Sequence, residues 1–439
     1  MQLSSYFISI SIQQIIEKML ITRLLEFFAR NNVRYDLQYG FRRGSSTSTA
    51  ITELVDDLIG ELEKKQVVGA LFLDLKKAFD TLDHDILLSK LESYGIRGIA
   101  NEIISSYLSN RQQFVQIEND KSTLLNIETG VPQGSNIGPL LFLIYVNDIY
   151  RLHLHGVPRL FADDTALFYP RNSPRIIVSH IEQDLVVLMN YFNTNLLSLN
   201  ISKTKYMIFH SPRKKIEAHP DPRLEQIYIE KVEQFKYLGV HFDSVLSWDY
   251  HIKQLVRKTS VLCGFMKRVR SFVTNNALLK FYYACIHSQF QYLTIVWGHA
   301  CKSKLSRLQV LQNRCLKIVF NLPHFYPTRN LYSNGTHYIL PIRGLCEIQT
   351  LILVHNVLFN ETAHHNLDLP VGNRLHNTRQ ANNLQRARAT TNLDQTRLRY
   401  EGPLKFNALP NDLKNIRSTA IFKARLKVFL KQKSDIFLR

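Results

Sequence analysis

The spacing of apolar residues along the first third of the chain alternates between helical and strand periods. Apolar positions recur through residues 14–28 with charges between them, which predicts an amphipathic helix. A second helix is expected over about residues 49–64, and the all-apolar run 67–73 (VVGALFL) is typical of a buried central strand. That strand ends at Asp74, and Asp83 is placed to cap the next helix. This pattern predicts a mixed α+β fold.

The alternation continues beyond a Gly/Pro turn at residues 129–134. Pro139 suits the first turn of an apolar helix that reaches about Tyr150. Two short apolar strands flank Asp163 and Asp164, which predicts a tight hairpin. The remaining expected elements are a helix over 174–195, strands over 205–209 and 235–242, helices through 248–320, and shorter helices over 402–413 and 420–431.

Composition and charge narrow the class of protein. The chain has 439 residues, 45% hydrophobic, which excludes a disordered or collagen-like protein. Its formal net charge is +19, and no acidic residue lies between Asp249 and Glu347. A short basic run would be a solvated face, but one this long indicates a bound polyanion. Nucleic acid is the favoured partner; an acidic membrane surface is the alternative, but it explains none of the carboxylates and lacks Trp-rich amphipathic stretches.

The cysteines and the apolar runs indicate where the chain resides. Five cysteines without a CxxC pair argue against a disulfide scaffold or a structural zinc site, and fit a reducing compartment. The longest uninterrupted apolar run, Pro139 to Val146, is far shorter than a membrane span, and no signal peptide opens the sequence. We therefore expect an intracellular protein, in the cytoplasm or the nucleus.

Three aspartates are candidates for the chemistry. Asp74 ends a buried strand, where an anion is costly unless it is exposed, paired or bound to metal. Asp163 and Asp164 at a hairpin tip are, alone, typical turn residues. Together, a strand end and a neighbouring hairpin could supply the oxygen ligands of a two-magnesium phosphoryl-transfer site.

An ordered set of motifs then resembles one family. The motifs are LQYGFRRGSSTSTA (37–50), LFLDLKKAFDTLDH (71–84), TGVPQGSNIGPLLFLIYVNDI (129–149), LFADDTALF (160–168), LNISKTKYMIF (199–209) and FKYLGVHFD (235–243). In this order they resemble the reverse transcriptases of non-LTR retrotransposons, most closely the jockey-like group. The tail motif GPLKFNALP (402–410) resembles the C-terminal region of that group.

The resemblance implies a right-hand polymerase fold in the α+β class. Its expected regions are truncated fingers (1–66), a palm with an antiparallel sheet (67–247), a helical thumb (248–330) and a basic C-terminal extension (331–439). Relatives carry an endonuclease domain and further fingers residues upstream, so Met1 would begin inside the first fingers block. Because those upstream fingers residues contact the triphosphate in relatives, we expect this chain to hold the nucleotide less tightly than its relatives do.

The resemblance also assigns roles to individual residues. Asp74 and Asp163 would bind two Mg²⁺ ions, with Mn²⁺ as an alternative, and Asp164 would be the neighbouring acid. Phe79 would exclude a ribose 2′-hydroxyl, and Lys203 would protonate the leaving pyrophosphate. The other implied contacts are Gly134 at the nascent base pair, Gln133 at the incoming nucleotide or the template, Arg42 and Arg43 at template phosphates, and Tyr237, Leu238 and Gly239 at the primer end.

Each of these residues also has a purely structural interpretation. Phe79 could be a core residue of a short helix, Gln133 a satisfied loop amide, and the basic side chains solvated. The function implied is RNA-directed DNA polymerisation. The expected partners are an RNA template, a DNA primer and dNTPs, and no interaction with a membrane is expected. The alternative is a catalytically silent, nucleic-acid-binding remnant of a mobile element, which primer extension on an RNA template would distinguish.

Overall fold

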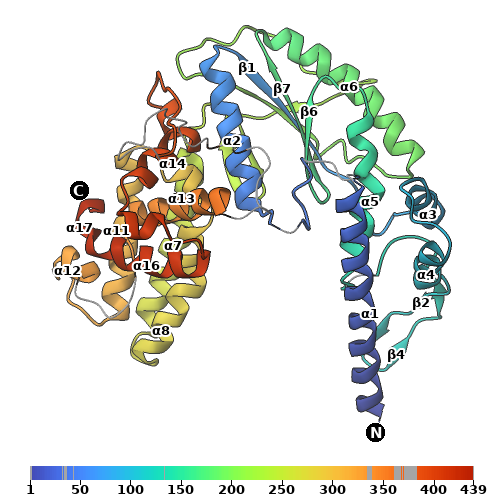
Figure 1. Ribbon diagram of the computed structural model, residues 1–439, viewed down its shortest axis with the longest axis horizontal. Helices are drawn as coiled ribbons and strands as arrows, with labels where there is room; N and C mark the ends of the chain where they lie inside the picture. The colour runs from blue at the N-terminus through green and yellow to red at the C-terminus, as the bar shows by residue number, and fades with distance from the viewer. Residues whose placement is uncertain are drawn as a thin grey trace. The chain divides into compact units, whose positions relative to one another are not determined.

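In the computed structural model (Figure 1), the described residues are 2–31, 33, 37–42, 44–132, 134–333, 339–359, 367, 369 and 383–438. Predictions made for Arg43, Gln133 and much of the polar tail lie outside them. The chain forms two compact units: one comprises Met1–Arg42, Val68–Met207 and Ile216–Val232, and the other Arg43–Val67, Ile208–Lys215 and Glu233–Arg439. This division does not test the four functional regions expected from the sequence, which stay predictions.

The first unit is built on a five-stranded sheet with the order β11-β8-β1-β7-β6 (Figure 1). Its strands are β1 (Val67–Leu73), β6 (Val157–Phe161), β7 (Asp164–Arg171), β8 (Lys205–Phe209) and β11 (Glu230–Lys231). Every residue of β1 is buried, as expected for an apolar, β-branched run between two neighbouring strands. The short strands β2 (Gln112–Gln113), β3 (Gln116–Ile117), β4 (Asp120–Lys121), β5 (Leu125–Asn126), β9 (Arg223–Leu224) and β10 (Ile227–Tyr228) form separate two-stranded pairs.

The sheet is mixed, which corrects the expectation of an antiparallel sheet. Strands β6 and β7 form the expected antiparallel hairpin, with Phe161 opposite Asp164. At the other edge β11 runs parallel to β8. The chain leaves β8 and passes through the β9–β10 hairpin before β11, and such a long connection lets a strand re-enter in the same direction.

Helices of the first unit are α1 (Gln2–Arg30), α3 (His84–Ser93), α4 (Ile99–Leu108), α5 (Gly138–Val146), the 3₁₀ helix η1 (Asn147–Arg151) and α6 (Pro174–Thr194). The predicted cap of α3 is confirmed, since Asp83 accepts a hydrogen bond from the Ile86 amide at 2.9 Å. Pro139 lies in the first turn of α5, as expected, but the N-cap there is Ile137 and not Ser135 or Asn136. Helix α6 packs closely on the sheet, since a Cβ at Gly69 would lie 2.2 Å from Ile177.

The second unit is mainly helical. It contains α2 (Thr47–Glu63), the hairpin β12 (Gln234–Tyr237) and β13 (Val240–Asp243), α7 (Asp249–Val269), α8 (Asn275–Phe281), the π-helix η2 (Tyr282–His287), α9 (Ser288–Gln291), α10 (Thr294–Trp297), α11 (Lys302–Val319), α12 (Thr328–Ser333), α13 (Ile342–Phe359), η3 (Asp394–Thr396), α14 (Leu398–Asn407), α15 (Asn411–Lys414), α16 (Thr419–Gln432) and α17 (Ser434–Phe437).

An ion-pair network joins α2 to the C-terminal part of the second unit. Asp56 is only 2% exposed, and its Oδ2 lies 3.2 Å from the Arg397 guanidinium and 3.3 Å from that of Arg399. A buried carboxylate needs such partners, because its desolvation is otherwise uncompensated.

Two further expectations concern the cysteines and membrane spans. All five cysteines are free thiols. Among the described helices, α13 is long and apolar enough to cross a bilayer by length and composition alone, and half of it is buried in the protein, as in the core helices of soluble proteins.

Candidate active site

The three candidate aspartates meet at one end of the sheet in the first unit. Asp74 follows β1, and Asp163 and Asp164 lie where β6 turns into β7, the strand beside β1. Partial desolvation raises the pKa of Asp164 to about 6, and the negative charges of Asp163 and Asp74 contribute to the rise. The structure therefore brings these carboxylates within electrostatic reach of one another.

Asp74 also contacts the loop that carries Lys203. The Lys203 Nζ lies 3.6 Å from Asp74 Oδ2, and both side chains are substantially exposed. The backbone supports this contact: the Asn200 amide donates to the Asp74 carbonyl at 2.7 Å, and the Lys76 amide donates to Ser198 at 2.8 Å. Lys203 thus forms an ion pair with Asp74, although an exposed pair stabilises the fold little.

The donor types of this cluster suit a divalent ion. Carboxylate oxygens are the ligands that Mg²⁺ and Mn²⁺ prefer, and a cation would offset the desolvation and the repulsion that raise the pKa of Asp164. Within the described residues, however, no three His, Cys, Asp or Glu side chains converge closely enough to hold an ion. The aspartates are neighbours in this structure, and metal binding would require their side chains to draw together.

Gln38 holds the turn that carries the aspartates, a role the sequence did not indicate. Ala162 has a φ of +58°, a strained value for a residue with a Cβ. The Gln38 Oε1 accepts hydrogen bonds from the amides of Gly40 (2.9 Å) and Ala162 (3.2 Å). A Cβ at Gly40 would lie 2.4 Å from the Ala162 nitrogen, so only glycine permits this approach.

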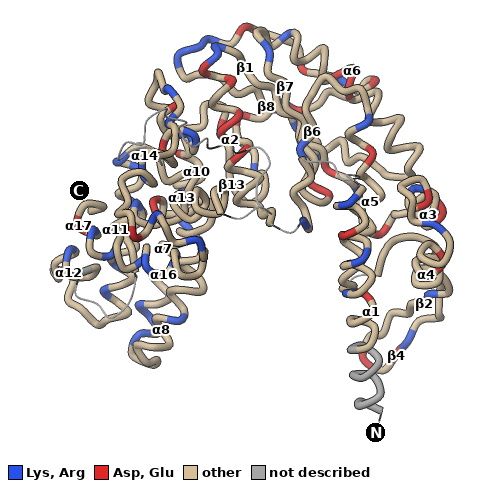
Figure 2. The backbone as a smooth tube through the Cα atoms, viewed as in Figure 1, with Lys and Arg blue, Asp and Glu red and all other residues tan. Residues whose placement is uncertain are grey.

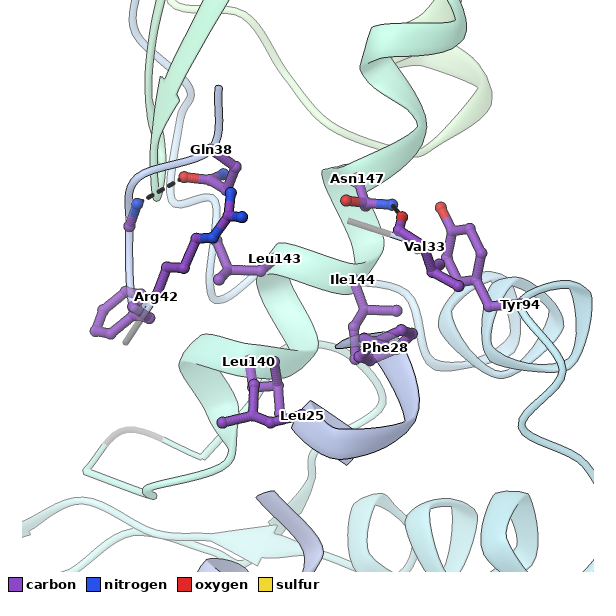
Figure 3. A pocket seen from close by; sticks show the side chains of 12 residues that line it. Leu25, Phe28, Val33, Gln38, Arg42, Tyr94, Leu140, Leu143, Ile144 and Asn147 are labelled. Atoms are coloured by element: carbon purple, nitrogen blue, oxygen red, sulfur yellow. Dashed lines mark hydrogen bonds between the residues drawn. The ribbon is translucent and has the colours of Figure 1, made fainter. Parts of the chain in front are cut away.

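A small apolar pocket lies beneath the loop that carries Gln38 and Arg42 (Figure 3). Leu140 and Leu143 of α5 and Leu25 of α1 line the same pocket as the loop. Two ladder bonds tie the loop to β6: the Tyr39 amide donates to Leu160 at 2.9 Å, and the Leu160 amide to Leu37 at 3.0 Å. Arg42 is thereby placed on the loop that supports the aspartate turn.

Phe79 lies beside the turn that contains Gly134. The Val131 amide donates to the Phe79 carbonyl at 3.0 Å, and the Phe79 ring lies 4.6 Å from the buried ring of Phe142. Phe79 as a whole is half-buried. Gly134 has a φ of +85° and open space where a Cβ would be. An approaching ligand could therefore come close to this backbone.

The predicted primer-contact residues lie on the β12–β13 hairpin of the second unit. Leu238 (φ +43°) and Gly239 (φ +81°) form its turn, whereas Tyr237 is buried. The Tyr292 hydroxyl donates to the Leu238 carbonyl at 2.8 Å, and its ring would touch a Cβ at Gly239. Tyr292 therefore supports the turn, a second contact that sequence patterns did not indicate.

A groove of about 710 Å³ runs from this turn along α7. Among the described residues that line it, none is acidic, and the basic and aromatic ones include Lys236, Arg257, Lys258 and Tyr292. Figure 2 shows Lys and Arg recurring along α7. We call this the turn groove, and its charge suits a phosphate backbone.

Comparison with known proteins gives the same family as the motifs. The family described as "Reverse transcriptase (RNA-dependent DNA polymerase)" matches residues 7–242. A probable RNA-directed DNA polymerase from transposon BS of Drosophila melanogaster is 29% identical over 342 residues, covering 74% of this chain and 37% of that protein. The RNA-directed DNA polymerase from mobile element jockey of Drosophila funebris is 25% identical over 331 residues, covering 73% of this chain and 36% of that protein.

The chain thus spans little more than a third of the length of these relatives. Among solved structures, apo telomerase from Candida tropicalis has a TM-score of 0.40 and 11% identity, covering 70% of this chain and 50% of that one.

Proposed function

The chain belongs to the reverse transcriptase family, among the enzymes of non-LTR retrotransposons, and from this premise we propose that it is an RNA-directed DNA polymerase. It adds dNTPs to the 3′-hydroxyl of a DNA primer on an RNA template. In this proposal the fold is a right hand: the sheet with its aspartates is the palm, and the basic helices from α7 onward form the thumb. The carboxylates gathered at the sheet end are the single observation that carries the proposal.

Asp74 and Asp163 are the residues proposed to hold two Mg²⁺ ions, with Asp164 beside them. When bound, such ions would lower the pKa of the primer hydroxyl and neutralise the triphosphate. Asp164 supports this role because its charge is unfavourable without a cation, as its raised pKa indicates. Lys203 offers a movable ammonium 3.6 Å from Asp74, and we propose that it donates a proton to the leaving pyrophosphate.

The substrate contacts follow from the surroundings of the aspartates. Phe79 is proposed to exclude a ribose 2′-hydroxyl with its ring, and Gly134 to let the nascent base pair approach. Gln133 would contact the nucleotide or template beside it. Arg42 and its neighbour Arg43 are proposed to meet template phosphates, as guanidinium groups do well.

The primer end is proposed to rest on the β12–β13 turn. Leu238 and Gly239 would touch the primer, while buried Tyr237 would support them from below. The turn groove then offers Lys236, Arg257 and Lys258 to the primer phosphates.

Primer extension on an RNA template tests the proposal. Asp163→Asn should lower kcat by about a hundredfold or more, because an amide is a poor ligand for a hard divalent ion. Asp85→Asn, an equal change on the exposed first turn of α3, is the matched control and should keep full activity. Primer–template affinity should be unchanged in both variants.

Two results would count against this function. Full activity of Asp163→Asn would remove the metal assignment. A wild-type chain that binds primer–template yet does not extend it would favour the catalytically silent remnant.

A further inference from the structure

Helix α7 carries two grooves on opposite faces. Gln254, Arg257, Lys258 and Val261 line the turn groove, whereas Ser260, Cys263, Gly264 and Lys267 line a second one. The turn groove is also lined by His251, Leu255 and Leu262 of α7. At 3.6 residues per turn, the centre of this full set lies roughly 160° around the helix from the centre of the second set. Both grooves belong to the second unit, and an α-helix with its side chains is about 10–12 Å thick. A strand seated in one groove therefore cannot also fill the other.

The second groove, here called the rear groove, lies between the C-terminal halves of α7 and α11. It has a volume of about 700 Å³ and continues onto the segment after α11. Its basic lining residues are Lys267, Arg270, Arg314, Lys317 and His324. Among the described residues that line it, none is acidic and none is Phe, Tyr or Trp; His324 is its aromatic ring.

Most of these cations have no carboxylate partner among the described residues. In the described part of the chain, no ion pair joins Lys267, Arg270 or Arg314 to a carboxylate, and Arg270 Nε is buried without a hydrogen-bond partner. Lys317 donates to the His324 carbonyl at 2.5 Å, which is a neutral acceptor. Like charges held together in a concave site repel one another unless an anion enters.

We propose that the rear groove binds the phosphate backbone of a second, single-stranded nucleic acid segment, separate from the primer–template. Ser260, Asn313 and Thr328 add neutral hydrogen-bond donors to the cations. A Cβ at Gly264 would meet no atom within 4 Å, so the wall of the groove is open there. The described lining offers five basic side chains but no Phe, Tyr or Trp, which favours contact with phosphates over base stacking, so binding is tolerant of base sequence.

A binding experiment on the full chain tests this site. The chain is saturated with primer–template, and a short, fluorescently labelled single-stranded RNA is then titrated at several salt concentrations. The test variant is Lys267→Gln/Arg314→Gln, and the matched control is Arg257→Gln/Lys258→Gln in the turn groove. Thermal melting verifies that both double variants remain folded.

The rear-groove variant should bind the second RNA about tenfold more weakly, with a log K against log salt slope shallower by about 1.4, since each single-strand phosphate contributes about 0.7. Its primer–template affinity should stay within about twofold of wild type, whereas the control variant should show the reverse. The same loss should occur with single-stranded DNA, because DNA and RNA share the phosphates.

Three results would overturn the proposal. One is a rear-groove variant that binds the second RNA with wild-type affinity, and another is an equal loss of primer–template affinity in both double variants. The third result is a rear-groove variant that binds RNA more weakly but single-stranded DNA with wild-type affinity. The proposal goes beyond polymerase activity, and its test measures only binding affinities. A chain that fails to extend primers can therefore still be used to test it.

Discussion

At the scale of single residues, the aspartate turn depends on a side chain far away in sequence. Gln38 accepts a hydrogen bond from the amide of Ala162, a residue 124 positions later, and Ala162 is held at a strained φ of +58°. Such strain persists only where surrounding contacts enforce it. Gln38 is therefore a positioning residue for Asp163 and Asp164.

Gln38→Met keeps the length of the side chain and removes the acceptor oxygen. We expect kcat to fall by about tenfold, because small displacements of reacting groups slow the chemical step. The KM for primer–template should be unchanged. Hydrogen exchange measured by mass spectrometry should show faster exchange of the Ala162 amide. Gln38→Glu keeps an acceptor and should retain that protection. Unaltered exchange in Gln38→Met would mean that the turn holds itself.

The raised pKa of Asp164 predicts a pH-dependent stability. Its pKa is about 6 in the folded chain against an ordinary 3.8, so the folded state binds the extra proton and stability falls as pH rises through that window. Asp164→Asn should therefore raise the Tm above about pH 6, with the gain fading below about pH 4. Addition of Mg²⁺ should raise the Tm of wild type more than that of the variant. A Tm gain of equal size at all pH values would contradict this account.

Residue patterns predicted part of the site. The apolar strand ending in Asp74 and the hairpin carrying Asp163 and Asp164 were evident from local sequence, and the structure places them together. The roles of Gln38 and Tyr292 were not evident from local sequence, because each acts through a hydrogen bond to a backbone group distant in sequence. The spacing of apolar and polar residues does not predict such a bond.

At the scale of elements, local pattern predicted the long helices and buried strands well. Strand β1, helix α6 and strand β8 follow their expected limits closely. The strands β2 to β5 have two exposed residues each, too few to show an alternation. The parallel pairing of β11 depends on the path of the chain after β8, which side-chain pattern does not encode.

The β12–β13 hairpin gives a prediction at this scale. Tyr292→Phe removes the hydrogen bond to Leu238 and keeps the ring against Gly239. One net hydrogen bond of about 1 kcal/mol corresponds to roughly a fivefold rise in the KM for primer–template, with kcat little changed. Tyr228→Phe, on an exposed residue of β10, is the control. If both variants extend primers with the wild-type KM, the turn is rigid without Tyr292.

At the scale of the whole molecule, a net charge of +19 predicts salt-sensitive binding. The affinity for primer–template should fall linearly in a plot of log K against log salt, with a slope steeper than about −3, because each neutralised duplex phosphate contributes about 0.9. Anisotropy titrations at increasing KCl measure the slope, and Asp163→Asn should leave it unchanged. A slope near zero would mean that the basic residues do not contact phosphates. The excess of basic residues can be counted in the sequence, but their distribution over two faces of α7 is seen only in the folded structure.

The buried Asp56 sets an order of events during synthesis of the chain. Its partner Arg397 is 341 positions later, so α2 leaves the ribosome long before that arginine exists. At about 5–20 residues per second, the interval is roughly 20–70 s. Throughout it, the face of α2 that carries Asp56 must stay hydrated or be shielded by a chaperone. A nascent chain released before Arg397 would keep that face exposed, and would be a ready substrate for quality-control proteases.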